Sequence, residues 1–215
     1  MPKKLFPILS FFLLVPSLLA NILLTQKTET NYQGELVTEV VDGDTFFIEN
    51  RQPIRLYGLD APELGFCYSQ EAKKKLEELI LNKKVILAEP RTDHTGRILP
   101  LVYIDGILVN EILIKNGFAI SRRQGGTATE AFRIANDNAR ENNLGIFSPN
   151  CYQPDPVDSK CVIKGNINSQ NKKSYFLPNC ANYNQVIIEK FEGEEYFCTE
   201  TEAKKAGYIK SKTCY

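Results

Sequence analysis

Short alternations of hydrophobic and polar residues occupy the first half of this chain and predict a sheet. The segments 36–41, 45–49 and 54–59 alternate with a period of two and are separated by turn residues, which is typical of a β-meander. Two further runs, 85–88 and 98–104, have the same aliphatic character. We therefore expect five strands in this part of the chain.

Hydrophobic residues recur at helical spacing in three other places. The repeat that follows Ser69 predicts a helix with this serine as its N-cap. Segment 109–116 predicts a short helix that ends before Gly117, and segment 129–143 predicts a third helix. Pro100 lies inside a predicted strand without a backbone N–H to donate, so we expect a sheet edge or a bulge there.

Three short motifs carry the residue types that metal-assisted cleavage of a phosphodiester requires. They read Asp42-Gly43-Asp44-Thr45, Arg55-Leu56-Tyr57-Gly58-Leu59-Asp60-Ala61-Pro62-Glu63 and Arg91-Thr92-Asp93-His94-Thr95-Gly96-Arg97. A hard divalent cation binds carboxylate and carbonyl oxygens, an attacking water needs a base, and a crowded anionic transition state is stabilised by guanidinium groups. The candidate residues are Asp44, Asp60, Glu63, Arg55 and Arg97.

Each motif has an ordinary structural interpretation when it is taken alone. An Asp-Gly pair such as Asp42-Gly43 is most often a plain turn, and residues 60–63 could be a loop that leads into a helix. Single arginines are usually solvated on the surface. Five suitable residues in one ordered pattern are hard to explain by turn chemistry, so the joint pattern favours a hydrolytic site.

In their order and spacing these motifs resemble the staphylococcal nuclease (thermonuclease) family over about residues 34–147. The resemblance implies an α+β fold, a five-stranded OB-like β-barrel with three helices, for a domain that we place at residues 31–150. It also implies calcium-dependent hydrolysis of DNA and, as a second substrate, of RNA.

The resemblance also assigns a role to each motif residue. The calcium ligands would be Asp44, Asp60 and the backbone carbonyl of Ala61. Glu63 would be the general base, and Arg55 and Arg97 would bind the phosphate through planar paired donors. Water would attack phosphorus, the bond to the 5′ oxygen would break, and a 3′-phosphate would remain.

The chain departs from the family pattern in two loops. His94 and Thr95 stand where the type member has a Lys-Tyr pair, and His94, the only histidine, is interpreted as a solvated residue outside the catalytic set. The tyrosines that flank the nucleotide after the second helix are missing. Arg122 and Arg123 stand in that region and offer phosphate contacts, which predicts weak base preference.

The charge balance limits the kind of nucleic-acid binding that we expect. The 215-residue chain has a formal net charge of zero, and between residues 31 and 150 there are 14 Lys and Arg against 17 Asp and Glu. A protein that coats duplex DNA normally has a basic surplus. We therefore expect turnover of short or single-stranded substrates by a monomer, without tight non-specific binding.

Residues 1–30 have the composition of a targeting segment. Lys3 and Lys4 precede an apolar run over residues 5–24, which fits either a signal peptide, with Ala20 as the cleavage residue, or an N-terminal membrane anchor. A buried core helix is a third interpretation, and we favour it least because the nuclease-like domain is complete without it. The protein is expected to be secreted, or anchored to the outer face of the cytoplasmic membrane.

Six cysteines in an exported chain predict disulfides. Cys67 follows the second motif and Cys151 follows the third predicted helix, so we propose that they join the two ends of the nuclease-like domain. The remaining cysteines all lie in the C-terminal part, and the sequence does not choose among their pairings: Cys161, Cys180, Cys198 and Cys214. A structural zinc site is the alternative, although the chain has no Cys-x-x-Cys pair.

The segment 151–160 has linker composition and predicts a domain boundary. After it, residues 161–215 are similar to the small module called a sunset domain, through segments 161–167 and 196–208. This implies a small disulfide-containing α+β unit. Thr199 is expected to cap a short helix that ends at Gly207.

Two other functions remain open from the sequence. The barrel could be a catalytically inactive OB fold that binds nucleic acid or protein. Alternatively, the C-terminal module could bind the cell envelope while the barrel serves as its scaffold.

Overall fold

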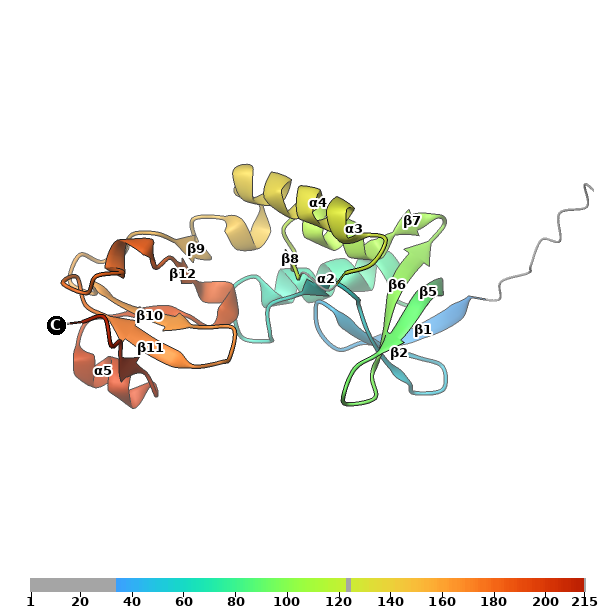
Figure 1. The fold of residues 1–215 in the computed structure, drawn as a ribbon. Coiled ribbons are helices and arrows are strands. Elements are labelled where there is room, and N and C mark those ends of the chain that lie inside the picture. The colour runs from blue at the N-terminus through green and yellow to red at the C-terminus, as the bar shows by residue number, and fades with distance from the viewer. Residues whose placement is uncertain (1–33, 123–124, 215) are drawn as a thin grey trace, which may run out of the picture. The chain divides into compact units, whose positions relative to one another are not determined.

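Five strands close into a barrel in the first half of the molecule. The computed structural model describes residues 34–122 and 125–214. The barrel strands are β1 (Glu35–Val40), β2 (Thr45–Ile48), β3 (Pro53–Arg55), β5 (Lys84–Thr92) and β6 (Ile98–Ile104), with β7 (Ile107–Leu108) added beside β6. The strands follow the order β3-β2-β1-β5-β6, of which β1, β2, β5 and β6 are labelled in Figure 1. A parallel contact of Ile54 with Ile98 closes the sheet. The predicted five-stranded barrel is confirmed.

Alternate strand residues point inward and form the core with residues from three helices. The helices are α2 (Ser69–Ile80), α3 (Val109–Lys115) and α4 (Thr129–Glu141). The fully buried side chains include Val37, Phe46, Ile54, Leu76, Ile80, Val85, Val102, Leu113 and Ile114. Because the period of two and the helical spacing both place these residues on one face, the hydrophobic pattern is enough to predict this core.

The predicted strand at residues 54–59 is wrong in its second half. β3 ends at Arg55, and Gly58 adopts a left-handed conformation with φ of 77°. The chain then forms β4 (Leu59–Asp60), which pairs with β8 (Ile120–Ser121) in a separate two-stranded sheet. This break turns the second motif out of the barrel wall.

Ser69 does not cap helix α2, and this prediction is also wrong. The helix begins at Ser69 itself, and the N-cap is Tyr68 in a left-handed conformation. The Ser69 hydroxyl accepts a hydrogen bond from the Gly65 N–H at 3.2 Å. The serine therefore fixes the loop before the helix.

Pro100 lies opposite a bulge, as its missing N–H predicts. The register of β5 against β6 shifts between Ala88 and Arg91, whose partners are Leu101 and Leu99. Asn110, fully buried at the start of α3, compensates for the irregular ladder. Its Oδ1 accepts a hydrogen bond from the Val102 N–H at 2.8 Å, and its Nδ2 donates to the Tyr57 and Pro100 carbonyls at 2.9 and 3.4 Å.

The C-terminal residues form a second α+β region. Its sheet has the order β13-β10-β11-β14, and its elements are β10 (Ile163–Ile167), β11 (Lys173–Phe176), β13 (Glu195–Phe197), α5 (Glu200–Lys205) and β14 (Ile209–Lys210). Its own core contains Ile163, Tyr175, Phe197, Ala203 and Tyr208. Thr199 caps α5 in a reciprocal capping box with Glu202, so the predicted cap is confirmed.

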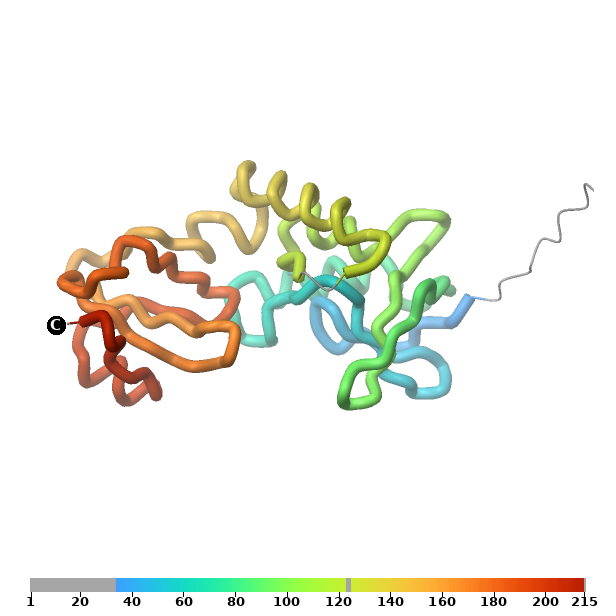
Figure 2. The backbone as a smooth tube through the Cα atoms, viewed as in Figure 1, coloured from blue at the N-terminus to red at the C-terminus, as the bar shows by residue number. Residues whose placement is uncertain are grey.

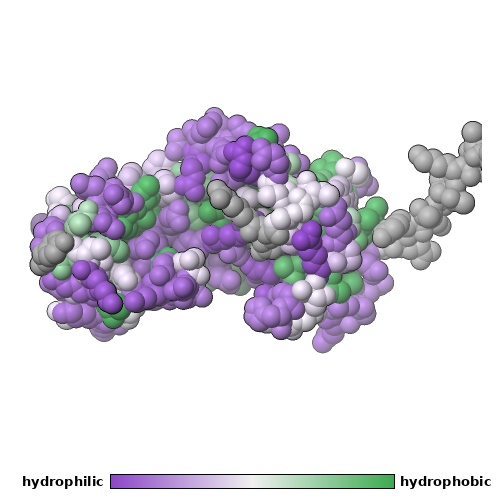
Figure 3. Space-filling model, in the orientation of Figure 1, coloured by the Kyte–Doolittle hydropathy of each residue, from purple (hydrophilic) through white to green (hydrophobic). Residues whose placement is uncertain are grey.

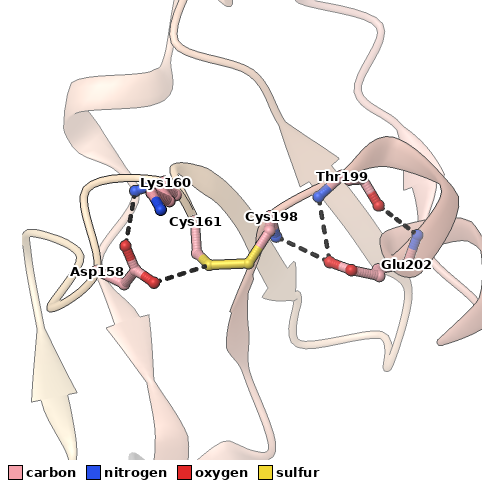
Figure 4. Close-up of a disulfide and its surroundings, with 6 residues drawn as sticks. All are labelled: Asp158, Lys160, Cys161, Cys198, Thr199 and Glu202. Carbon is pink, nitrogen blue, oxygen red and sulfur yellow. Dashed lines mark hydrogen bonds between the residues drawn. A yellow bond between two sulfur atoms is a disulfide. The ribbon is translucent and has the colours of Figure 1, made fainter.

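Three disulfides pair all six cysteines. The bonds join Cys67 to Cys151, Cys161 to Cys198 and Cys180 to Cys214. The first is the pairing expected from the sequence, and the zinc alternative is excluded for these cysteines. Figure 4 shows the second bond beside the α5 capping box, where the Cys198 N–H donates to the Glu202 carboxylate.

The predicted linker at 151–160 is folded at its start. The strand β9 (Tyr152–Gln153), which follows η2 (Gly145–Phe147), pairs with β12 (Ile188–Glu189). In the chain, β12 lies between the short helices η3 (Tyr183–Gln185) and η4 (Lys190–Glu192). Phe191 of η4 is buried in a cluster with Ala139, Ile146, Phe147 and Cys151. Figure 2 traces this return of the chain, and the barrel and the C-terminal region together form one compact unit.

The predicted targeting segment, residues 1–30, lies outside the described residues. Among the described helices, none is long and apolar enough to span a membrane. On the face shown in Figure 3, hydrophobic residues form small separate patches among hydrophilic ones.

Replacing Asn110 with alanine is expected to lower the free energy of unfolding by about 2–4 kcal/mol, because it removes the acceptor of the buried Val102 N–H and one donor to Tyr57. Urea denaturation measures the change. Asn116→Ala is the matched control, since its side chain donates only to the Ile112 carbonyl in an exposed position, and a shift below about 0.5 kcal/mol is expected. Equal effects of the two substitutions would contradict the role of Asn110.

Candidate active site

The turn between β1 and β2 places Asp44 against the second motif. The Asp42 carboxylate accepts hydrogen bonds from the Asp44 and Thr45 N–H groups at 3.0 and 2.8 Å. A Cβ atom on Gly43 would lie 2.6 Å from the Cβ of Ala61, so only glycine allows this close approach. The Asp-Gly pair is thus a turn that also brings two motifs together.

Asp44 is a buried carboxylate, with 1% of its surface exposed. It accepts hydrogen bonds from the Ala61 N–H at 2.9 Å, from the Thr45 hydroxyl at 2.9 Å and from Arg55 at 2.7 Å. Burial raises the pKa of Asp44 to about 7, and the Arg55 guanidinium opposes this shift. The negative charge at this position is therefore incompletely balanced by the protein alone.

Arg55 connects the two predicted metal ligands. It lies opposite Thr45 in the β2–β3 register, and its guanidinium contacts the carboxylates of both Asp44 and Asp60. The side chains of Arg55 and Asp44 are 16% and 2% exposed, so this ion pair is largely shielded from water, whereas the Asp60 side chain is 36% exposed. Two acids from separate motifs thus converge on one positive group.

Arg122 is held by two carboxylates. The pairing of β4 with β8 brings it to Asp60, which accepts a hydrogen bond from the Arg122 Nε at 3.2 Å. Its Nη2 donates to Glu192 of η4 at 2.6 Å. Arg122, predicted to contact phosphate, is therefore engaged by protein acids, and Arg123 lies outside the described residues.

Arg97 is oriented by a short turn of the third motif. The Asp93 carboxylate accepts hydrogen bonds from the Arg97 N–H and Nε at 3.0 and 2.8 Å, and from Thr95. These contacts, led by the Thr95 hydroxyl, hold the pKa of Asp93 below its ordinary value. Arg97 lines a pocket of about 280 Å³ that also includes Arg55, Asp60, His94 and Arg122.

Glu63 lies three residues after Asp60, in the same loop. It is exposed, its carboxylate makes no hydrogen bond or ion pair with any described residue, and it lines a second pocket together with Asp60 and Ala61. A free carboxylate at this place can accept a proton from a nearby water.

The structure brings the predicted residues around Asp60 and adds partners that the sequence does not predict. Asp93 precedes a Thr-Gly turn, so an Asx-turn signal could have identified it as a positioning group. Glu192 carried no local signal, because it meets Arg122 only through the folding of the C-terminal part.

The oxygen ligands fit a hard divalent cation. Asp44 and Asp60 contact the same guanidinium, so their oxygens lie near one positive centre. Carboxylate oxygens, like the backbone carbonyl that Ala61 would supply, are of the type that such a cation prefers. Within the described part of the chain, no group of three or more His, Cys, Asp or Glu side chains could hold a metal.

Comparison with known proteins gives one family and several relatives. Residues 53–149 match the model described as "Staphylococcal nuclease homologue". The "Micrococcal nuclease" of Shigella flexneri is 34% identical over 138 residues, covering 58% of this chain and 79% of the relative. An "Uncharacterized endonuclease" of Escherichia coli is 30% identical over 159 residues, covering 72% of this chain and 94% of the relative. "Endonuclease YncB" of Bacillus subtilis is 29% identical over 151 residues, covering 63% of this chain and 72% of the relative.

Removal of the Cys67–Cys151 bond by replacing both cysteines with alanine is expected to loosen the loop that carries Glu63 and to lower the unfolding free energy by about 2–5 kcal/mol. The Phe66 and Cys67 amides, which donate to the Glu63 and Lys190 carbonyls, should exchange faster with deuterium. Replacing Cys161 and Cys198 is the matched control. If that pair accelerates the same amides equally, the local role of the first bond is wrong.

Proposed function

We infer that this chain, which belongs to the staphylococcal nuclease family and is a nuclease, hydrolyses DNA and RNA with calcium and leaves 3′-phosphates. Nucleases of this family are generally metal-dependent. The observation that carries the proposal is the convergence of Asp44 and Asp60 on one positive centre beside a pocket with three arginines.

Calcium held by Asp44, Asp60 and the Ala61 carbonyl would polarise a phosphate oxygen and lower the pKa of a coordinated water. Arg55 and Arg97 would bind the non-bridging phosphate oxygens, since both guanidinium groups line the pocket next to Asp60. Asp93 would fix the direction of Arg97 through its Nε hydrogen bond.

Glu63 would take the proton from the attacking water. Its exposed carboxylate has no other partner among the described residues, so it is available as a base. The water oxygen would bond to phosphorus while the bond from phosphorus to the 5′ oxygen breaks. The 5′ oxygen would leave and take a proton from solvent, which gives a 3′-phosphate and a 5′-hydroxyl.

We also propose that the protein acts outside the cytoplasm. The three disulfides support this location, because such bonds persist in oxidising compartments. The apolar run after Lys3 and Lys4 supports an exported chain, either cleaved or held at the outer face of the membrane.

The nuclease proposal is tested with residues 31–215, single-stranded DNA and RNA, and calcium, magnesium or chelator. We expect hydrolysis with calcium, no hydrolysis with chelator, and products that a 3′-phosphatase can dephosphorylate. Glu63→Gln should reduce kcat about 100-fold or more through loss of the base, and Arg97→Ala by a similar factor through loss of charge stabilisation.

Arg133→Ala is the matched control, because this arginine pairs with Glu130 and Asp137 on the exposed side of α4, and its activity should stay within about twofold of the original. Hydrolysis that continues in chelator, or that both site substitutions leave unchanged, would contradict the mechanism.

The location is tested by expressing the full chain with a C-terminal epitope in a bacterial host. We expect the epitope outside the cytoplasmic membrane and all six cysteines protected from alkylation before reduction. A chain without residues 2–30 should remain in the cytoplasm with alkylatable thiols. Retention of the full chain in the cytoplasm with reduced cysteines would contradict export.

A further inference from the structure

A second pocket, of about 390 Å³, shares Asp60 with the arginine-lined pocket. One wall comes from the catalytic loop, residues 60–66, and the other from the C-terminal region. Residues that matter for its chemistry are Asp60, Glu63, Phe66, Ile167, Lys173 and Glu192. Its volume lies in the range of small-molecule sites.

Phe66 presents an aromatic surface to this pocket. Phe66 is 43% exposed. It lies three residues after Glu63, and its N–H donates a hydrogen bond to the Glu63 carbonyl at 3.0 Å. A Cβ on Gly193 would lie 2.6 Å from the Cζ of Phe66, so the tip of the ring abuts the Gly193 backbone. The ring is thus fixed at its edge while its remaining surface is accessible.

The charges around the pocket favour a neutral, planar group over a phosphate. Three carboxylates line it, those of Asp60, Glu63 and Glu192. Lys173 is the one lysine or arginine among the lining residues, and its ammonium donates to the Ala206 carbonyl and lies over the Tyr208 ring. Carboxylates repel an anion such as a phosphate, whereas an aromatic ring stacks on any base.

The C-terminal wall is held firmly against the catalytic loop. Glu192 pairs with Arg122, which contacts Asp60, and the Cys67 N–H donates to the Lys190 carbonyl at 3.4 Å. Phe191, which lies between Lys190 and Glu192 in the chain, is 3% exposed. The pocket is therefore a preformed feature that needs no closing movement.

We propose that this pocket binds the base of a nucleotide next to the scissile phosphate, stacked on Phe66, in an unpaired strand. The inference rests on the proposed nuclease function. Because both pockets share Asp60, a strand whose phosphate lies at Arg55 and Arg97 continues past Glu63 into the second pocket. The C-terminal region thereby forms part of the substrate site.

The test uses a single-stranded oligonucleotide with one cleavable phosphodiester between neutral methylphosphonate linkages. Two further versions lack the base on the 5′ or the 3′ side of that bond. For the unmodified protein, loss of the base on one side should raise KM about tenfold. Phe66→Ala should raise KM for the intact strand by a similar factor and make loss of that base inconsequential.

Phe66→Tyr, which keeps the ring, should restore the sensitivity to the missing base. Ile107→Ala is the matched control, because Ile107 is also exposed but lies in the β6–β7 hairpin. Equal KM values for intact and baseless strands with the unmodified protein would overturn the inference. A drop in kcat for Phe66→Ala with the base effect retained would also overturn it, since the ring would then only support the loop.

If the unmodified protein cleaves none of the three strands or ordinary DNA, the proposed function itself fails. Cleavage with no base effect removes the pocket proposal alone. The two failures are therefore distinguished within one set of measurements.

Discussion

A negative charge buried at Asp44 is the constraint on which the site depends. Its carboxylate has lost almost all contact with water, and one guanidinium, that of Arg55, supplies the nearest positive charge. Because Arg55 also contacts Asp60, the positions of both acids are set by the same group. The three side chains form one electrostatic unit, and a change in any member alters the balance of the other two. This explains why acids and arginines from distant motifs occur together in a small barrel.

Much of this arrangement can be predicted from the sequence, because it follows from periodicity and from ordered motifs. The barrel strands, the three helices and the pairing of Cys67 with Cys151 correspond to local patterns or to positions at the ends of elements. The errors arise where tertiary contacts override local preference. Ser69 looks like a cap, but the loop before it uses its hydroxyl. The strand at residues 54–59 is cut by the turn at Gly58.

The partners of the site residues were harder to predict than the residues themselves. Arg122 is a residue type that often contacts phosphate, yet in the structure it pairs with Asp60 and Glu192. Glu192 is 70 residues away from Arg122 in sequence. Asn110 likewise gives no hint in the sequence that it replaces a ladder partner beside Pro100. Such contacts depend on which surfaces meet after folding, and hydrophobic periodicity contains no information about that. The contact of the C-terminal region with Arg122 therefore could not be predicted from the sequence.

The closure of the barrel has a consequence for how activity develops as the chain folds. One pair of residues, Ile54 and Ile98, joins β3 to β6 across 44 positions of sequence. Arg55 follows the first of these residues and Arg97 precedes the second, so the contact that completes the sheet also brings together the two arginines proposed to bind phosphate. Long-range contacts of this kind form late because their loop entropy must be overcome first. A chain with most of its secondary structure but an open barrel would therefore be inactive. Recovery of activity during refolding would then report closure of the barrel.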